Sequence, residues 1–193
     1  MTQTAEIAPF YPHVTERSLR LAAVYFPILV ECAKQKELIY YGELVERAKA
    51  LHPDNADAQN AIPVSTGRVL DVIRTFCLTR ELPNLASLVV SRGTDIPGDG
   101  FADLEKATEL QQEAFAFDWL AHTVTFDTHI VEAIRVVKLK PRPNGMADEM
   151  RWDYYIAHKE QLPANINASK GAITALLMEG YEPADAFAMA MQR

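Results

Sequence analysis

Residues 66–80, TGRVLDVIRTFCLTR, decide the predicted fold because their apolar side chains recur at the spacing of an α-helix. At about 100° per residue, an arc of about 120° holds five of these side chains: Val69, Leu70, Ile73, Phe76 and Cys77. Arg68 and Arg74 fall on the opposite side. We therefore predict an amphipathic helix that is capped by Ser65 or Thr66 and presents two arginines to solvent.

The segments around this helix predict a winged helix-turn-helix over residues 38–101. Before this helix the sequence indicates a strand at 38–41, another helix at 43–51 and a loop at 52–61. After it the sequence indicates a β-hairpin, with strands at 86–90 and 96–101 and a turn at 91–94. This order of elements is typical of the winged helix-turn-helix, in which the second helix enters the major groove of DNA.

Helices are predicted on both sides of the winged-helix core. Residues 16–36 favour an N-terminal helix, which Pro27 should kink or split. Beyond the core, apolar spacing and turn residues favour further helices over about 101–120, 127–137, 148–160, 169–179 and 183–191. The predicted fold is mostly α with a small β-hairpin. It comprises a helical lead-in at 1–37, a winged-helix-like domain at 38–101 and a helical C-terminal region at 102–193 that packs on that domain.

Composition places the chain among folded globular proteins. Its 193 residues are 49% hydrophobic and 23% charged, which leaves enough apolar side chains for a core. No run of about eighteen apolar residues occurs, and the start of the chain lacks the features of a signal peptide. We therefore predict no membrane partner and a cytoplasmic location. Cys32 and Cys77 lie in apolar helical patterns and are predicted to be reduced core thiols.

The net charge of −7 is unevenly distributed. Residues 94–132 carry nine acidic side chains and a single basic one, Lys106. Residues 62–93 carry four arginines against two acids, and residues 135–142 carry four cations and no acid. The acidic total argues against loose, sequence-independent coating of DNA, whereas the local basic faces permit a focused contact.

The basic faces supply the predicted DNA contacts. Arginine can contact phosphates or bind guanine through two hydrogen bonds, so we expect the outward side of the 66–80 helix to enter the groove. The tip of the hairpin and the basic stretch 135–142 would add contacts to the backbone. The predicted DNA-contacting residues are Thr66, Arg68, Asp71, Arg74, Thr75, Arg92, Arg135, Lys138 and Lys140. The alternatives are an ordinary surface helix, a solvated turn, and cations that stabilise the negative end of a helix dipole.

Short motifs in the same region resemble a known family. The motifs are Tyr41-Gly42-Glu43-Leu44, Gly67-Arg68, Pro83 and the run LVVSRG at 88–93. They resemble the C-terminal DNA-binding domain of the O6-alkylguanine-DNA alkyltransferases and the alkyltransferase-like proteins. That domain has a Tyr-Gly-Glu helix start, an arginine on its recognition helix and a Pro-Cys-His-Arg-Val-Val run before the wing. The resemblance covers about one third of the chain and implies a winged-helix domain that binds DNA.

The chain departs from that family at the residue that carries the activity. Depending on the alignment, Ala86 or Asn84 stands at the position of the family's cysteine, and Ser87 and Leu88 replace its histidine and arginine. Cys77 lies on the apolar side of the preceding helix, whereas a thiolate nucleophile must be exposed. The resemblance therefore implies DNA binding without alkyl transfer.

We predict a non-catalytic winged-helix protein of bacterial or phage origin that binds double-stranded DNA without a cofactor or metal ion. The alternative is a protein-interaction subunit or inhibitor in a bacterial defence or phage-encoded assembly. It would use the winged fold, and the acidic segment 94–132, to bind a protein. An enzyme activity is the third alternative. His122 and His129 could share one helix face and hold a metal ion, although packed or surface histidines are the simpler interpretation.

Overall fold

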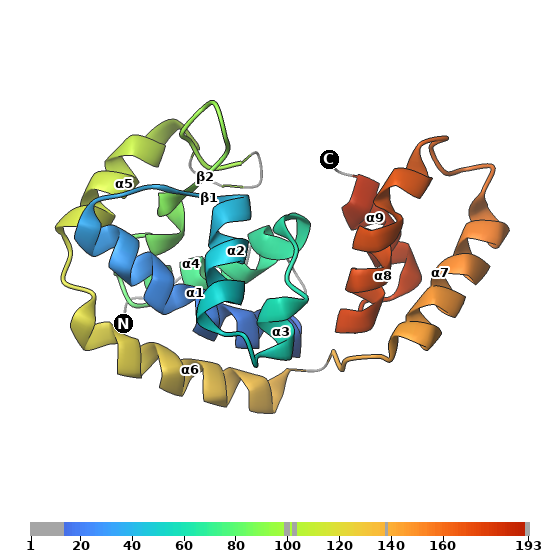
Figure 1. The fold of residues 1–193 in the computed structure, drawn as a ribbon, viewed down its shortest axis with the longest axis horizontal. Helices are drawn as coiled ribbons and strands as arrows, with labels where there is room; N and C mark the ends of the chain where they lie inside the picture. The colour runs from blue at the N-terminus through green and yellow to red at the C-terminus, as the bar shows by residue number, and fades with distance from the viewer. Residues whose placement is uncertain (1–13, 99–100, 102–103, 138, 192–193) are drawn as a thin grey trace, which may run out of the picture. The chain divides into compact units, whose positions relative to one another are not determined.

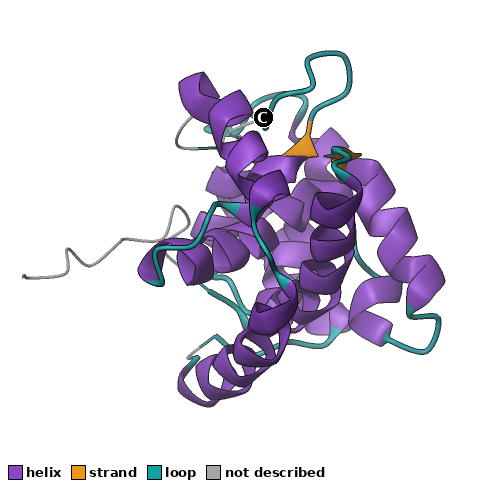
Figure 2. Cartoon of the chain, turned by 90° about the vertical axis from the view of Figure 1, so that its left-hand side faces the viewer, coloured by secondary structure: helices purple, strands orange, loops and turns teal. Residues whose placement is uncertain are grey.

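Most of the chain is helical, which confirms the coarse fold class predicted from the sequence (Figure 1; Figure 2). The computed structural model describes residues 14–98, 101, 104–137 and 139–191. The strands drawn in orange in Figure 2 belong to one small sheet. None of the described helices is long and apolar enough to cross a bilayer.

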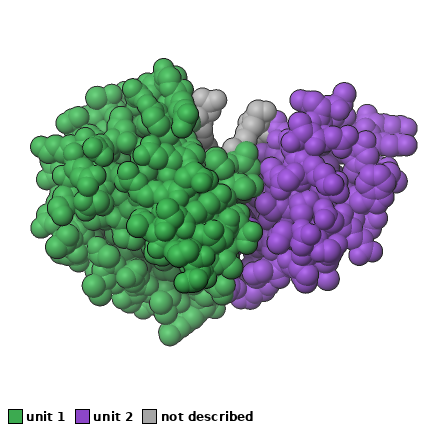
Figure 3. Space-filling view, viewed as in Figure 1, with its two compact units in different colours: residues 1–14, 18–136 green, residues 15–17, 137–193 purple. Residues whose placement is uncertain are grey.

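The chain forms two compact units, which Figure 3 shows in different colours. Among the described residues, unit 1 comprises Val14 and residues 18–136, and unit 2 comprises residues 15–17 and 137–191. The sequence predicted that the C-terminal region begins at residue 102, whereas the C-terminal part of unit 2 begins at residue 137. The helices between these two positions therefore group with unit 1 and not with the C-terminal region.

Unit 1 alternates helices with two very short strands. Its elements are α1 (Glu16–Gln35), β1 (Ile39–Tyr40), α2 (Tyr41–Leu51), α3 (Ala56–Gln59), η1 (Pro63–Ser65), α4 (Thr66–Thr79), η2 (Leu85–Leu88), β2 (Val89–Val90), η3 (Leu104–Lys106), α5 (Ala107–Ala116), η4 (Leu120–His122) and α6 (Thr123–Val136), where η denotes a 3-10 helix. The first turn of α1, through Arg17, groups with unit 2. The predicted helices over 43–51 and 66–80 are confirmed as α2 and α4, within two residues at each end.

An aromatic cluster joins three helices in the core of unit 1. The ring of Phe26, on α1, stacks on that of Phe126, on α6, with 4.0 Å between centroids. Phe76, on α4, meets both rings edge-on, and all three side chains are fully buried. Pro27 follows on the exposed side of α1, where its ring meets solvent, and α1 continues through it as one helix. The split that Pro27 suggested in the sequence does not occur.

The two strands of unit 1 pair in parallel and not as a hairpin. Ile39 pairs with Val89, and Tyr40 with Val90. A parallel pair needs a long connection between its strands, and here α2, α3 and α4 provide it. Ile39, Val89 and Val90 are each at most 1% exposed, so burial of these apolar side chains holds the small sheet in place.

The β-hairpin predicted over residues 86–101 is wrong for the part of it that the structure describes. Residues 85–88 form the 3-10 helix η2, in which the Asn84 side chain accepts a hydrogen bond from Ala86 N at 3.2 Å. The turn after β2 closes through a hydrogen bond from Ser91 N to Ile96 O at 2.8 Å. Pro97 follows and has no N–H to donate to a second strand, and residues 97–98 form no strand. Within residues 86–98 and 101, which the structure describes, no wing forms, and the fold is confirmed only at the coarser level.

Unit 2 consists of helices around a small core of its own. Its elements are α7 (Asn144–His158), η5 (Ile166–Ser169), α8 (Lys170–Glu179) and α9 (Pro183–Met191). The core contains Ile173, Leu177, Tyr181 and Phe187, each at most 2% exposed. The helices predicted over 169–179 and 183–191 are confirmed as α8 and α9.

The turn between α8 and α9 depends on a glycine. Gly180 has a φ of 108° and ends α8, with its N–H directed at Leu176 O and Leu177 O. A Cβ at this position would lie 2.5 Å from Lys140 O, so no other residue fits without a shift of the backbone. Arg142 also binds this end of α8, because its side chain donates to Leu177 O and Tyr181 O and pairs with Glu182. Part of the basic stretch 135–142 therefore stabilises a helix end.

Candidate functional site

The side of α4 that the sequence directed toward DNA is buried. Thr66 is 0% exposed, Arg68 is 7% exposed and Asp71 is 4% exposed. Arg74 Nη1 lies 3.2 Å from Asp71 Oδ1, and the Arg74 side chain is only 14% exposed. Thr75 is half-buried. The prediction that these five residues form an outward, groove-reading surface is therefore wrong for this structure.

The reason is that α4 is covered on more than its apolar side. The 3-10 helices η1 and η2 both contact α4, and η2 itself is buried from Leu85 to Leu88. Asp71 and Arg74 lie one turn apart in the helix and form an ion pair, so the negative charge of buried Asp71 is compensated locally. Periodicity located the most apolar side of α4 correctly but could not show what covers its polar side.

The predicted hairpin tip is a loop that is held by two tyrosines at the start of α2. Tyr40 Oη donates to Asp95 Oδ1 at 3.1 Å, and this hydrogen bond raises the pKa of Tyr40. The guanidinium of Arg92 lies 5.5 Å from the centroid of the Tyr40 ring. Tyr41 Oη accepts from Gly98 N at 3.1 Å. Arg92 is exposed, but its guanidinium makes a cation–π contact with the Tyr40 ring, whose hydroxyl binds Asp95.

The remaining predicted contacts do not form one basic surface within either unit. Arg135 is exposed at the end of α6, in unit 1. Lys140 belongs to unit 2, where its Nζ lies 3.8 Å from Glu16 Oε2. Lys138 lies outside the described residues. In unit 1 the exposed predicted contacts are thus Arg92 and Arg135, which come from a loop and from a helix end.

A different surface emerges on α6, whose inner side is firmly anchored. Phe126 enters the aromatic cluster of the core, and Ile130, one turn later, is 4% exposed. The ring of His129 lies 5.3 Å from that of Phe76, and burial lowers the pKa of His129. Before the helix, Trp119 is 3% exposed and its Nε1 donates to Ala114 O at 2.8 Å. These contacts fix which side of α6 faces away from the core.

That outer side carries large apolar side chains. Leu120 is 72% exposed, Val124 is 75% exposed and Val131 is 53% exposed. Spacings of four and seven residues place them on one face of the helical segment that η4 and α6 form together. Single exposed apolar residues are ordinary, whereas an aligned set is typical of an interaction surface. We call this set the α6 ridge. Figure 1 shows α6, in yellow, on the outside of unit 1.

Acidic side chains flank the α6 ridge. Relative to Val124, Asp127 is turned by about 60° to one side and Glu132 by about 80° to the other. Both are exposed. No lysine or arginine occurs from residue 107 to residue 134, a segment that carries Glu109, Glu113, Asp118, Asp127 and Glu132. The ridge therefore combines an apolar centre with a negative border.

The structure offers no chemistry of the kind that the alkyltransferases use. Burial raises the pKa of Cys77 to about 12 and also raises the pKa of Cys32, so neither side chain forms a thiolate readily. Asn84, Ala86 and Ser87 are buried. Across the described residues, histidine, cysteine and carboxylate side chains do not gather in threes that could hold a metal ion.

Comparison of the chain with models of known protein families, with curated proteins and with solved structures finds no match. The candidate site therefore stands on the geometry of unit 1. The sequence had singled out the acidic segment 94–132, and the α6 ridge lies within it. It missed the ridge because Leu120, Val124 and Val131 are ordinary core-type residues, and only the orientation of α6 shows them to be outside.

Proposed function

We propose that this protein is a protein-interaction module that binds a partner through the α6 ridge. The observation that carries the proposal is the exposure of Leu120, Val124 and Val131, at 72%, 75% and 53%, on one face of the consecutive helices η4 and α6. Complete burial of a valine or leucine side chain stabilises a complex by about 1.5 to 3 kcal/mol. An amphipathic partner helix is a common way to bury such a stripe.

The charges around the ridge define the chemistry of the partner. Asp127 and Glu132 border the ridge on opposite sides, and the nearest cation along the chain, the exposed Arg135, lies four residues after Val131 on the same face of α6. A partner helix with an apolar stripe bordered by lysine or arginine would match both features. A second copy of this chain matches less well, because it would bring the same carboxylates toward one another.

DNA binding remains a prediction that has less support. Arg92 is exposed, which is the observation in its favour. Against it, Arg68 is buried on α4, Arg74 is largely covered there, and the acidic segment 94–132 would repel phosphates. The resemblance to alkyltransferase DNA-binding domains likewise remains a prediction. We therefore favour the alternative that the sequence had left open, in which the fold binds a protein.

The test is a two-step binding experiment with matched variants of α6. Affinity capture from cells that produce the protein is compared for the wild type, for Val124→Asp combined with Val131→Asp, and for Thr125→Asp. Thr125 is also exposed on α6 but lies to the side of the ridge, so it controls for added charge. The captured candidate is then purified and titrated by calorimetry at low and high salt.

We expect a saturable complex that the double variant loses, that Thr125→Asp keeps and that salt weakens. The proposal fails if no protein distinguishes the wild type from the double variant, or if the purified candidate binds both equally. A labelled DNA duplex is titrated in parallel. Saturable, steeply salt-dependent binding that Arg92→Ala abolishes would support the DNA-binding function in its place.

A further inference from the structure

Asn144, the first residue of α7, is the only asparagine in the sequence that is followed by a glycine. Asparagine is a chemically labile residue. Its side-chain carbonyl carbon can be attacked by the backbone nitrogen of the next residue, and glycine hinders this attack least because it has no Cβ. Neither Asn144 nor Gly145 belongs to the α6 ridge, so an inference about this pair does not depend on the proposed function.

The pair is open to water at the start of α7. Asn144 and Gly145 are both exposed, and a Cβ added to Gly145 would lie in open space among the described residues. The first N–H groups of an α-helix have no acceptor within the helix. Pro143 precedes α7 and has no side-chain acceptor that could cap it. Solvent can therefore reach the Gly145 N–H, and the first turn can open locally at low cost.

The other asparagines lack this combination of features. The side chains of Asn55 and Asn84 each accept a hydrogen bond from a backbone N–H, which holds the carboxamide in place. The side chain of Asn60 donates to a backbone carbonyl. Asn165 and Asn167 are exposed, but isoleucine and alanine follow them. Exposure and a following glycine thus meet at Asn144 alone, and Asn167 provides an internal control.

We propose that Asn144 is a site of spontaneous deamidation in the folded protein. The Gly145 nitrogen loses its proton and forms a bond to Cγ of Asn144, and the side-chain nitrogen leaves as ammonia. Water then opens the cyclic imide that results. If water breaks the new bond, the product is aspartate. If it breaks the original peptide bond, the product is isoaspartate, whose backbone runs through Cβ and Cγ. One water molecule is consumed and one ammonia is released, so no oxidant or reductant is needed.

The two products act on α7 in opposite directions. The first turn of α7 contains no acid, so an aspartate at position 144 would face the positive end of the helix dipole favourably. Isoaspartate instead lengthens the backbone between Pro143 and Ala147, whose N–H donates to Pro143 O at 3.1 Å across the site. An α-helical hydrogen bond closes a ring of fixed size, so the longer backbone cannot keep this bond without distortion.

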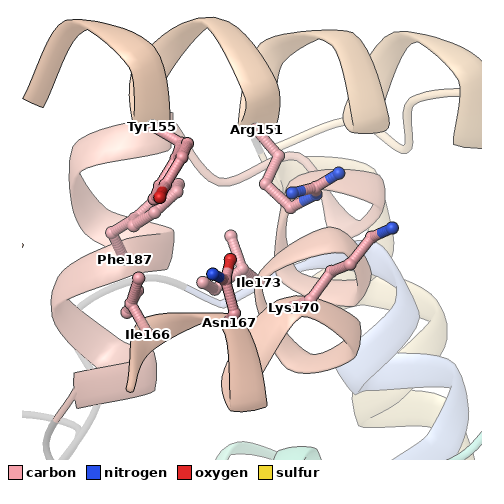
Figure 4. A pocket seen from close by; sticks show the side chains of 7 residues that line it. All are labelled: Arg151, Tyr155, Ile166, Asn167, Lys170, Ile173 and Phe187. Carbon is pink, nitrogen blue, oxygen red and sulfur yellow. The ribbon is translucent and has the colours of Figure 1, made fainter. Parts of the chain in front are cut away.

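A distorted first turn would loosen a closely packed part of unit 2. Ala147 is fully buried in the core of unit 2. Figure 4 shows Arg151 and Tyr155, on the same helix, directed toward η5, α8 and α9. The hollow that remains between these elements has a cavity volume of about 10 Å³, which is enough for about one water molecule, so α7 packs closely on its neighbours. The modification therefore acts at the edge of the unit 2 core.

The test follows the tryptic peptide 139–151, in which Asn144 is the only asparagine. The full-length protein is kept in buffer for weeks, and samples are digested and analysed by chromatography and mass spectrometry, which together separate the asparagine, aspartate and isoaspartate forms. We expect both products to accumulate at Asn144 while Asn167 keeps its amide. Conversion should be faster in mildly alkaline than in mildly acidic buffer, because the attacking nitrogen must lose its proton.

Matched glycine variants show whether the backbone nitrogen of residue 145 is the nucleophile. Gly145→Ala should slow the conversion about tenfold or more, because the added Cβ hinders the approach of the nitrogen to Cγ. Gly171→Ala makes the same change at an exposed position in the first turn of α8, and it should leave the rate at Asn144 unchanged. Both positions have room for a Cβ, so both variants should fold normally.

Hydrogen exchange measures the effect of each product on α7. The isoaspartate form is separated from the unmodified protein by ion exchange, and the Asn144→Asp variant represents the aspartate form. By NMR, the Ala147 amide should exchange faster than in the unmodified protein in the isoaspartate form and more slowly in Asn144→Asp. The Phe126 amide, in unit 1, should exchange at the same rate in all three samples.

Several results would overturn the proposal. If Asn144 keeps its amide as long as Asn167 does, or is converted only in urea-unfolded protein, the folded protein contains no such site. An equal rate in Gly145→Ala would show that the Gly145 nitrogen is not the nucleophile. Unchanged exchange at Ala147 in the isoaspartate form would show that the modification has no effect on the first turn of α7.

Discussion

Helices α4 and α6 are both amphipathic and both place a phenylalanine in the core of unit 1, yet their outer sides differ. The polar side of α4 is buried, with Arg68 and Asp71 at most 7% exposed. The outer side of α6 is open to solvent and apolar, with Val124 at 75% exposed. A simple amphipathic helix buries its apolar face and exposes its polar face. Helix α4 also buries polar residues, whereas α6 also exposes apolar ones.

This difference shows what helical periodicity can and cannot establish. The most apolar stripe of an amphipathic helix faces the core, and the spacing of Ile73 and Phe76 identifies it in α4. What covers the other side depends on how the rest of the chain packs against the helix, which the spacing of the helix's own residues does not show. A polar side that is covered needs internal ion pairs, whereas an apolar side that is left open is available for a partner.

The largest effect is expected on the inner side of α6. Phe126→Ala removes a fully buried ring that stacks on Phe26 and meets Phe76, so it should lower the free energy of unfolding by about 3 to 5 kcal/mol. Chemical denaturation followed by circular dichroism measures it. Val131→Ala, on the outer side of the same helix, is the control and should cost about 0.5 kcal/mol or less. Similar losses for both would show that the outer side of α6 is also covered.

The polar side of α4 should give the next largest effect. Arg74→Met leaves the carboxylate of Asp71, which is 4% exposed, without its pair to Nη1 at 3.2 Å. We expect a loss of about 2 kcal/mol in the free energy of unfolding. Arg135→Met, at the exposed end of α6, is the matched control. If Arg74 were open to solvent as the sequence suggested, both changes would cost about the same.

The sequence was sufficient for helices whose ends carry local signals. Gly180 and Pro183 marked the turn between α8 and α9 because each favours a backbone conformation that ends or begins a helix. The sequence was not sufficient to predict the sheet. Strands of two residues are too short to show an alternating pattern, and the parallel pairing joins residues 50 positions apart, as in Ile39 with Val89. Local sequence patterns do not specify such a pair, which the burial of its apolar side chains holds in place.

The candidate site, too, could be predicted from the sequence only in part. The nine acids of residues 94–132 were visible in the sequence and indicated a protein partner. The sequence predicted one long helix over 101–120, whereas α5 ends at Ala116 and the chain turns through Trp119 before η4. No glycine or proline marks this break. The orientation of α6, and with it the α6 ridge, therefore could not be derived from local signals.

A smaller effect is expected from pH on the inner side of α6. Burial, with Arg80 as the second cause, lowers the pKa of His129 below its usual 6.5, while Glu132 acts in the opposite direction. The unfolded chain then takes up the proton first, so stability is complete above about pH 6.5 and falls as the pH drops from there toward the folded pKa. The difference in unfolding free energy between the wild type and His129→Gln should therefore shrink or change sign between pH 7 and pH 5. His52→Gln, outside the aromatic cluster, serves as the control, and a constant difference for His129→Gln would contradict the prediction.

Val124→Asp should have the smallest effect on stability but a large effect on binding of the proposed partner. Val124→Asp changes a side chain that is 75% exposed, so the free energy of unfolding should stay within about 0.5 kcal/mol of the wild-type value. The same change adds a third carboxylate between Asp127 and Glu132 and should abolish binding of a basic, apolar partner. Denaturation and calorimetry on one preparation measure both quantities. If Val124→Asp unfolded the protein as Phe126→Ala does, the outer side of α6 would be part of the core, and the contrast between the two helices would disappear.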